Sequence, residues 1–122
     1  MTASKVPLAK ENDVYGAARW RDAAAREPYE ANGIKTVTVD LVKGDLSGLP
    51  EDVDYVAHFA VVKSNKWPVD LDGNVGGVLL LMERFQNAKA FLHCSTTAVY
   101  QPDGHTEFTE DSPLGDNHRD YF

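Results

Sequence analysis

A chain of 122 residues has room for one domain built around one hydrophobic core. Its apolar fraction of 43% and charged fraction of 25% are typical of a globular protein. The net charge of -7 argues against nucleic acid and anionic membrane surfaces as partners, because both attract basic proteins.

The cellular compartment is indicated by cysteine usage and by the lack of long apolar segments. The single cysteine, Cys94, excludes an intramolecular disulfide and is typical of a reducing compartment. Residues 1–5 lack the apolar stretch of a secretory signal. The longest apolar run, residues 75–82, is far shorter than the ~18 residues of a membrane span. We therefore expect a soluble cytoplasmic protein without membrane association.

The first elements expected along the chain are a strand and a helix. Residues 13–20 form a modest strand candidate. Asp22 can cap a helix that continues to Asn32 and Gly33, where it ends. Pro28 lies inside this segment, so we expect a kink or an early stop there.

Two further strand candidates follow, separated by turns. Residues 34–39 are rich in β-branched side chains and predict a second strand. A turn at 43–46 and a loop at 48–50 come next. Residues 53–60 form a nearly continuous apolar run, which predicts a strand buried on both faces.

The second half of the chain contains the clearest helix pattern and a fourth strand candidate. The helix ends near Asn87, before a strand at 89–95, and the polar segment after Tyr100 predicts a loop. Apolar residues of this helix recur on one expected face, namely Val75, Val78, Leu79, Met82 and Phe85. The alternation of strands and helices predicts an α/β fold with a parallel sheet and right-handed crossovers.

Three short motifs carry a family resemblance. His58-Phe59-Ala60 follows an apolar run, Asn74-x-x-Gly77 opens a long helix, and residues 95–100 read Ser-Thr-Thr-Ala-Val-Tyr. Together, in this order and spacing, they resemble the extended short-chain dehydrogenases/reductases of the NAD-dependent epimerase/dehydratase type. The resemblance covers about residues 13–122. It implies a partial Rossmann-like parallel sheet with flanking helices, in a single incomplete NAD(P)-binding domain over residues 1–122.

The chain departs from the family pattern at both ends. The family's Gly-x-x-Gly-x-x-Gly turn, which cradles the cofactor pyrophosphate, does not occur here. Residues 1–6 are similar to the beginning of the family's first strand and residues 7–11 to the end of the following helix. Tyr121 lies 25 positions after Thr96, which suits the family's catalytic tyrosine, but no lysine follows to complete Tyr-x-x-x-Lys. We expect a fragment that is inactive as an isolated chain.

The resemblance implies catalytic roles for two residues. Thr96 matches the family's Ser/Thr that hydrogen-bonds the substrate oxygen, with Ser95 and Thr97 as lesser candidates. Tyr121 matches the proton donor. The alternative for Thr96 is a loop threonine that satisfies its own backbone.

The resemblance also implies cofactor-binding positions. Asp45 resembles the acidic residue that accepts a hydrogen bond from the adenine amino group, with Leu46 packing beside the base, although an ordinary turn aspartate fits as well. His58, Phe59 and Ala60 are expected to line the cofactor groove together with Ser95, and His58 fits a structural role better than a catalytic one. Asn74 is expected to bridge backbone groups near the active site.

The choice between NADP and NAD rests on the segment after the first strand candidate. Arg19 and Arg21 favour the extra phosphate of NADP, whereas Asp22 keeps NAD open. We expect no metal site, because His93 and Cys94 alternate on a strand. His58, His93, His105 and His118 are scattered, and nothing in the sequence brings them together.

Two functions from different classes remain. The first is hydride transfer at a carbonyl or alcohol carbon of a small-molecule substrate. The alternative is a non-enzymatic α/β module, in which loss of the first strand exposes two strand edges and leads to a homo-oligomer. An unrelated flavodoxin-like domain is disfavoured because we find no phosphate-binding loop.

Overall fold

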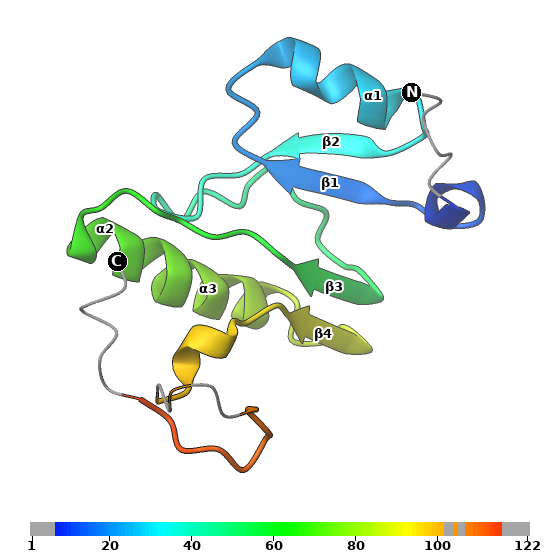
Figure 1. The fold of residues 1–122 in the computed structure, drawn as a ribbon. Coiled ribbons are helices and arrows are strands. Elements are labelled where there is room, and N and C mark those ends of the chain that lie inside the picture. Colours follow the sequence, from blue (N-terminus) through cyan, green and yellow to red (C-terminus); the bar gives the residue numbers. More distant parts are fainter. Residues whose placement is uncertain (1–6, 102–103, 105–106, 116–122) are drawn as a thin grey trace.

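The computed structural model describes residues 7–101, 104 and 107–115. It confirms a mixed α/β fold with parallel strands (Figure 1). No helix in these residues has the length and apolarity that a membrane span requires. In the element labels, η marks a short 3-10 helix, except for η3, which is a π-helical turn. The elements, in chain order, are η1 Pro7–Lys10, β1 Tyr15–Ala18, η2 Ala23–Arg26, α1 Glu27–Glu30, β2 Lys35–Thr38, β3 Tyr55–His58, α2 Trp67–Leu71, η3 Asp72–Gly76, α3 Gly77–Arg84, β4 Ala90–His93 and η4 Thr97–Val99.

The four strands form two separate parallel pairs instead of the single sheet that the sequence predicts. β1 pairs with β2, with Tyr15 opposite Lys35, and β3 pairs with β4, with Tyr55 opposite Ala90. Figure 1 shows all four strands running in the same direction, in the spatial order β2, β1, β3, β4. β1 and β3 are not hydrogen-bonded to each other. The parallel arrangement is therefore interrupted between them.

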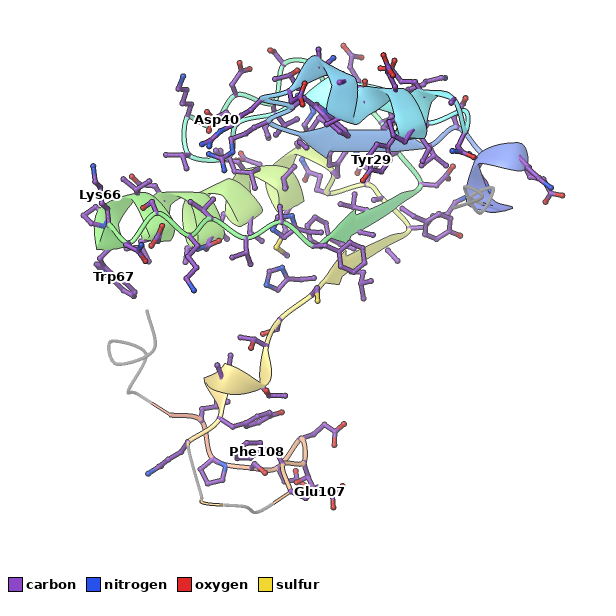
Figure 2. The ribbon with its side chains drawn as sticks, turned by 45° about the horizontal axis from the view of Figure 1, so that its top comes forward. Tyr29, Asp40, Lys66, Trp67, Glu107 and Phe108 are labelled. Carbon is purple, nitrogen blue, oxygen red and sulfur yellow. The ribbon has the colours of Figure 1, made fainter. Side chains whose placement is uncertain are left out.

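The first strand is shorter than predicted because the chain turns sharply at Trp20. The φ angle of Trp20 is 43°, a left-handed conformation that is rare for a bulky side chain. Its indole N–H donates to the carbonyl oxygens of Val37, at 2.9 Å, and Gly16, at 3.3 Å. The ring also meets Tyr29 edge-on, with centroids 5.3 Å apart (Figure 2 labels Tyr29). These contacts hold the turn after β1 in place.

The helical segment after β1 begins and ends as predicted, but Pro28 acts differently. The Asp22 carboxylate accepts a hydrogen bond from the Ala24 N–H at 2.9 Å and so caps η2. Pro28 lies in the first turn of α1, where its missing N–H costs nothing, so the predicted stop there is wrong. The change from η2 to α1 comes just before the proline. Gly33, with φ of 83°, ends the segment.

The long helical run starts at Trp67, well before Asn74, and only part of the predicted apolar face is buried: Phe85 is 7% exposed, whereas Val75 and Met82 are each 49% exposed. Leu81 is 7% exposed and lies in the core, whereas Leu79 is 61% exposed. The buried positions recur at every fourth residue from Gly73 through Gly77 and Leu81 to Phe85. The glycines also let another segment approach, since a Cβ on Gly77 would lie 2.8 Å from the Leu41 Cβ.

The hydrophobic core joins the two strand pairs through α3. Its buried members are Val39, Leu46, Leu81 and Phe85, and Val37, Val56 and Phe91 pack against them. Apolar residues from β2, β3 and β4 therefore meet on one side of the strands. The prediction that the third strand is buried on both faces is wrong, because Tyr55 is 70% exposed.

The segment after β4 folds back on itself. The ring of Tyr100 stacks on that of Phe108 with centroids 5.3 Å apart, and the Gln101 N–H donates to the Pro113 carbonyl at 2.8 Å. Figure 2 shows η4 and residues 107–115, including the labelled Phe108, away from the strand pairs. The predicted loop character of this segment is confirmed for its described residues.

Candidate functional site

The carboxyl ends of β3 and β4 lie side by side. His58 is opposite His93 in the parallel register, and the Cys94 N–H donates to the His58 carbonyl at 3.0 Å. Residues 59–60 and 95–96 therefore leave neighbouring strands at one edge, and all four are exposed. Open parallel α/β sheets bind their ligands at this edge. The structure thus brings five of the predicted site residues to one place, namely His58, Phe59, Ala60, Ser95 and Thr96.

The expectation that the histidines are scattered is wrong for one pair. The imidazoles of His58 and His93 stack with centroids 5.4 Å apart and planes inclined by 12°. Burial lowers the pKa of His58, and the nearby His93 adds to this effect. A signal for this contact was present in the sequence, since each of the two strand candidates, 53–60 and 89–95, contains one histidine near its carboxyl end. Sequence analysis missed it because strand pairing is a long-range property.

Thr96 makes a hydrogen bond to its own local backbone, as we expect for an ordinary loop threonine. Its Oγ1 accepts from the Ala98 N–H at 3.2 Å and caps η4. A hydroxyl that accepts one hydrogen bond keeps its own hydrogen for donation, so contact with a substrate oxygen stays possible chemically. The other predicted catalytic residue, Tyr121, lies outside the described residues.

Asn74 bridges backbone groups, as predicted. Its Nδ2 donates to the Val62 carbonyl at 2.8 Å, and its Oδ1 accepts from the Val62 N–H at 2.8 Å. The two bonds tie the segment after β3 to the helical run. Both ends of the amide are used in this contact, which makes Asn74 a positioning residue for the loop that follows Ala60.

Asp45 and Leu46 lie in the turn after β2. Gly44 has φ of 65°, and the Asp45 carboxylate accepts from the Ser47 hydroxyl at 2.7 Å and its N–H at 3.1 Å. The bonds from Ser47 lower the pKa of Asp45 below its ordinary value. Leu46 is buried in the core. An open hollow of about 440 Å³ lies beside Asp45, and its other lining residues include Leu80, Glu83 and Arg84.

Arg19 belongs to the other strand pair. It follows β1 and is exposed, as is Arg21. The nearby Arg26 is held by a 2.6 Å hydrogen bond to the Thr38 hydroxyl. The predicted site is therefore split between the ends of β1 and β2 and the ends of β3 and β4. In the part of the chain that the structure describes, no cluster of three or more acidic, histidine or cysteine side chains could hold a metal ion.

Comparison with protein families identifies the fold. A model of the NAD dependent epimerase/dehydratase family matches residues 5–122. The chain belongs to this family. Its two parallel strand pairs are parts of the Rossmann-like sheet of these NAD-dependent proteins. No curated protein matches the chain.

The residues of this epimerase/dehydratase chain fit only part of the dinucleotide. Small Ala60 and the hydroxyls of Ser95 and Thr96 suit a nicotinamide riboside at the edge of β3 and β4. The pyrophosphate is not accommodated in the same way. The sequence has no glycine-rich turn whose backbone amides could bind a pyrophosphate.

Proposed function

We propose that this chain carries part of the active site of an NAD(P)-dependent short-chain dehydrogenase/reductase of the epimerase/dehydratase type. The reaction is hydride transfer at a carbonyl or alcohol carbon of a small-molecule substrate. The observation that carries this proposal is the neighbouring position of Phe59-Ala60 and Ser95-Thr96 at one carboxyl edge. Family membership supports the same chemistry.

Each residue at the edge has a proposed role. Thr96 donates a hydrogen bond to the substrate oxygen, and Ser95 lies beside it on the cofactor side. Ala60 leaves room for the cofactor, with His58 and Phe59 forming the wall next to it. Tyr121 is the proposed proton donor. The nicotinamide, when bound, supplies the hydride chemistry and the protein orients it.

The adenosine end is proposed to contact Arg19, Asp45 and Leu46. NADP is favoured over NAD because Arg19 is exposed after β1, where it can meet a 2′-phosphate. Hydrogen bonds from the adenine amino group would add to those that Asp45 accepts from Ser47.

We further propose that residues 1–122 form a single NAD(P)-binding domain that does not turn over substrate by itself. The lack of a glycine-rich turn in these residues supports this, because that turn binds the pyrophosphate in the family. A cytoplasmic location is proposed from the free, exposed thiol of Cys94, which suits a reducing compartment.

A second candidate function is a non-enzymatic module that associates with another chain. The separation of the two strand pairs favours it, because among the described residues no strand is hydrogen-bonded to the second edge of β1 or of β3. A homo-oligomer formed through these edges is the simplest version of this proposal.

Titration of the purified chain with NADPH and NADH tests the two functions together. Nicotinamide fluorescence reports binding, and the mass in solution is measured in parallel. If the chain binds a dinucleotide as proposed, it should prefer NADPH to NADH. Arg19→Gln should abolish this preference. Lys10→Gln, a control substitution on η1, should leave it unchanged. A dimer without affinity for either dinucleotide at about 10 mM would favour the second function instead.

A further inference from the structure

β3 and β4 each end in a histidine, and the two side chains form one contact. His58 is 6% exposed, and His93 lies directly opposite it in the parallel register. The two imidazoles stack with centroids 5.4 Å apart and planes inclined by 12°, and His93 is exposed. The exposed ring therefore covers part of the buried one at the place where both strands end.

Within residues 7–101, 104 and 107–115, no acidic side chain neutralises this pair. Asp54, which precedes β3, pairs with Lys89 at the amino ends of the strands, and the Asp70 carboxylate accepts from the Ser64 N–H. The remaining ionisable side chains of segment 59–66, of the helical run and of the end of β4 are exposed or bonded to backbone carbonyls, namely Lys63, Lys66, Asp72, Glu83, Arg84 and Cys94. His93 is thus the charged group that acts on His58.

Protonation of His58 is opposed in two ways. Burial of the imidazole disfavours its cationic form, and a charge on His93 adds repulsion, so both lower the pKa of His58. The neutral ring keeps its place in the stack, whereas the cation gains solvation by leaving it. As the pH falls, the chain therefore takes up this proton by moving His58 out of its buried position.

His58 also takes part in the backbone contact between the two strands. The Cys94 N–H donates to the His58 carbonyl at 3.0 Å, and among the described bonds between β3 and β4 this one is nearest to the carboxyl edge. Residues 59–60 and 95–96, which form the proposed site, leave the two strands directly after it. Displacement of His58 therefore separates these two segments.

We propose that the His58–His93 pair is a proton-sensitive latch, which holds residues 59–60 next to residues 95–96 at neutral pH and releases them in acid. The latch regulates dinucleotide binding at this edge, and in this respect it rests on the proposed function. His58 takes up the proton, and His93 is the positioning residue that keeps His58 covered. Neither imidazole makes or breaks a bond of the substrate.

The other strand pair contains the same backbone bond without histidines. The Val39 N–H donates to the Ala18 carbonyl at 2.9 Å directly after β1 and β2, where Ala18 is opposite Thr38. Neither of these two side chains titrates. Val39 is therefore an internal control for Cys94 in an amide hydrogen exchange experiment on the unmodified chain.

Protection factors, which correct for the pH dependence of chemical exchange, are measured between about pH 7.5 and pH 5.5. The open state takes up one proton with a pKa of about 6.5 and the closed state resists it, so protection of the Cys94 amide should fall about three- to tenfold. Protection of the Val39 amide should change by less than about twofold. An equal fall at both amides would show that the proton acts on the whole fold, and an unchanged value at Cys94 would show that no latch exists. Either result overturns the proposal.

Two matched variants identify the titrating group. His58→Gln removes the proton acceptor and should abolish the pH dependence at Cys94, whereas His93→Gln should keep its direction with a smaller fall. Persistence of the full pH dependence in His58→Gln would overturn the assignment to His58. If His58→Gln does not fold, the comparison of Cys94 with Val39 in the unmodified chain and in His93→Gln still decides.

Dinucleotide binding separates the latch from the proposed function. Oxidised NAD is the ligand, because it lacks the 2′-phosphate of NADP, whose own titration at about pH 6 would interfere. Its affinity, measured from the amide shifts of Ala60 and Thr96, should fall by up to about tenfold per pH unit below the pH at which the His58 imidazole signals titrate. An affinity that stays constant through that titration overturns regulation by the latch. If neither NAD nor NADPH binds at any pH, the proposed function fails, and the Cys94 and Val39 amides still decide whether the latch exists.

Discussion

The imidazole of His58 lies nearly parallel to that of His93, with ring centroids 5.4 Å apart at the ends of two neighbouring strands. His58 is 6% exposed, and burial lowers its pKa below the ordinary value of about 6.5. As the pH falls below about 7, the unfolded chain therefore binds more protons than the folded chain does. The free energy of unfolding decreases as a result. For one proton the slope is at most about 1.4 kcal/mol per pH unit.

Urea unfolding between about pH 7.5 and pH 5.5 measures this effect. His58→Gln should flatten the pH dependence of the midpoint relative to the unmodified chain. His93→Gln should keep most of it, because burial of His58 is the larger cause. An unchanged pH dependence in the His58→Gln chain would show that His58 does not titrate as described.

Asn74→Ala tests the bridge to Val62. The substitution leaves the N–H and C=O of Val62 without their side-chain partners in a half-buried position. We expect a loss of about 1–3 kcal/mol in the free energy of unfolding. Asn87→Ala is the matched control, since Asn87 is exposed, and should change it by less than about 0.5 kcal/mol. Equal effects of the two substitutions would contradict the bridging role.

Alanine substitutions at two adjacent glycines should have opposite effects on the stability of the chain. A Cβ on Gly77 would lie 2.8 Å from the Leu41 Cβ, whereas a Cβ on Gly76 would meet nothing within 4 Å. Gly77→Ala should destabilise the chain by about 1–2 kcal/mol. Gly76→Ala should stabilise it by about 0.5–1 kcal/mol, because alanine favours the helix. Thermal unfolding of both variants measures the difference, and a gain in stability for Gly77→Ala would refute the close contact.

The corrected helix face predicts unequal roles for two leucines. Leu81→Ala removes a core side chain and should cost about 2–5 kcal/mol. Leu79→Ala removes a side chain that is 61% exposed and should cost less than about 1 kcal/mol. Urea titrations at one pH compare them directly. A larger loss of stability for Leu79→Ala than for Leu81→Ala would show that the buried helix face is the one expected from the apolar periodicity.

The order and type of the main elements could be predicted from the sequence, because each depends on local signals. The Asp22 cap, the β-branched run before Val39 and the turn at Gly44 are examples. The helix face could not be predicted, because the close approach of Leu41 to Gly77 and the packing of Leu81 in the core decide it. Neither of these is visible in apolar periodicity.

The candidate site was predictable as a set of residues but not as an arrangement. Motif spacing placed Ala60 and Thr96 at strand ends, and the parallel pairing of β3 with β4 brings these ends together. The stacking of His58 on His93 depends on strand register, and the engagement of Asp45 by Ser47 depends on the turn geometry. Such contacts are set by the folded backbone.

The most direct test of the central claim is an amide NMR titration of the isotopically labelled chain with NADPH. We predict weak binding, with a Kd of about 1 mM or weaker, and shift changes concentrated at Phe59, Ala60, Ser95 and Thr96. Lys10 and Asp13, before the amino end of β1, should not respond. Shift changes at those two residues with an unchanged carboxyl edge, or no response anywhere at about 10 mM, would contradict the assignment of a dinucleotide site to this edge.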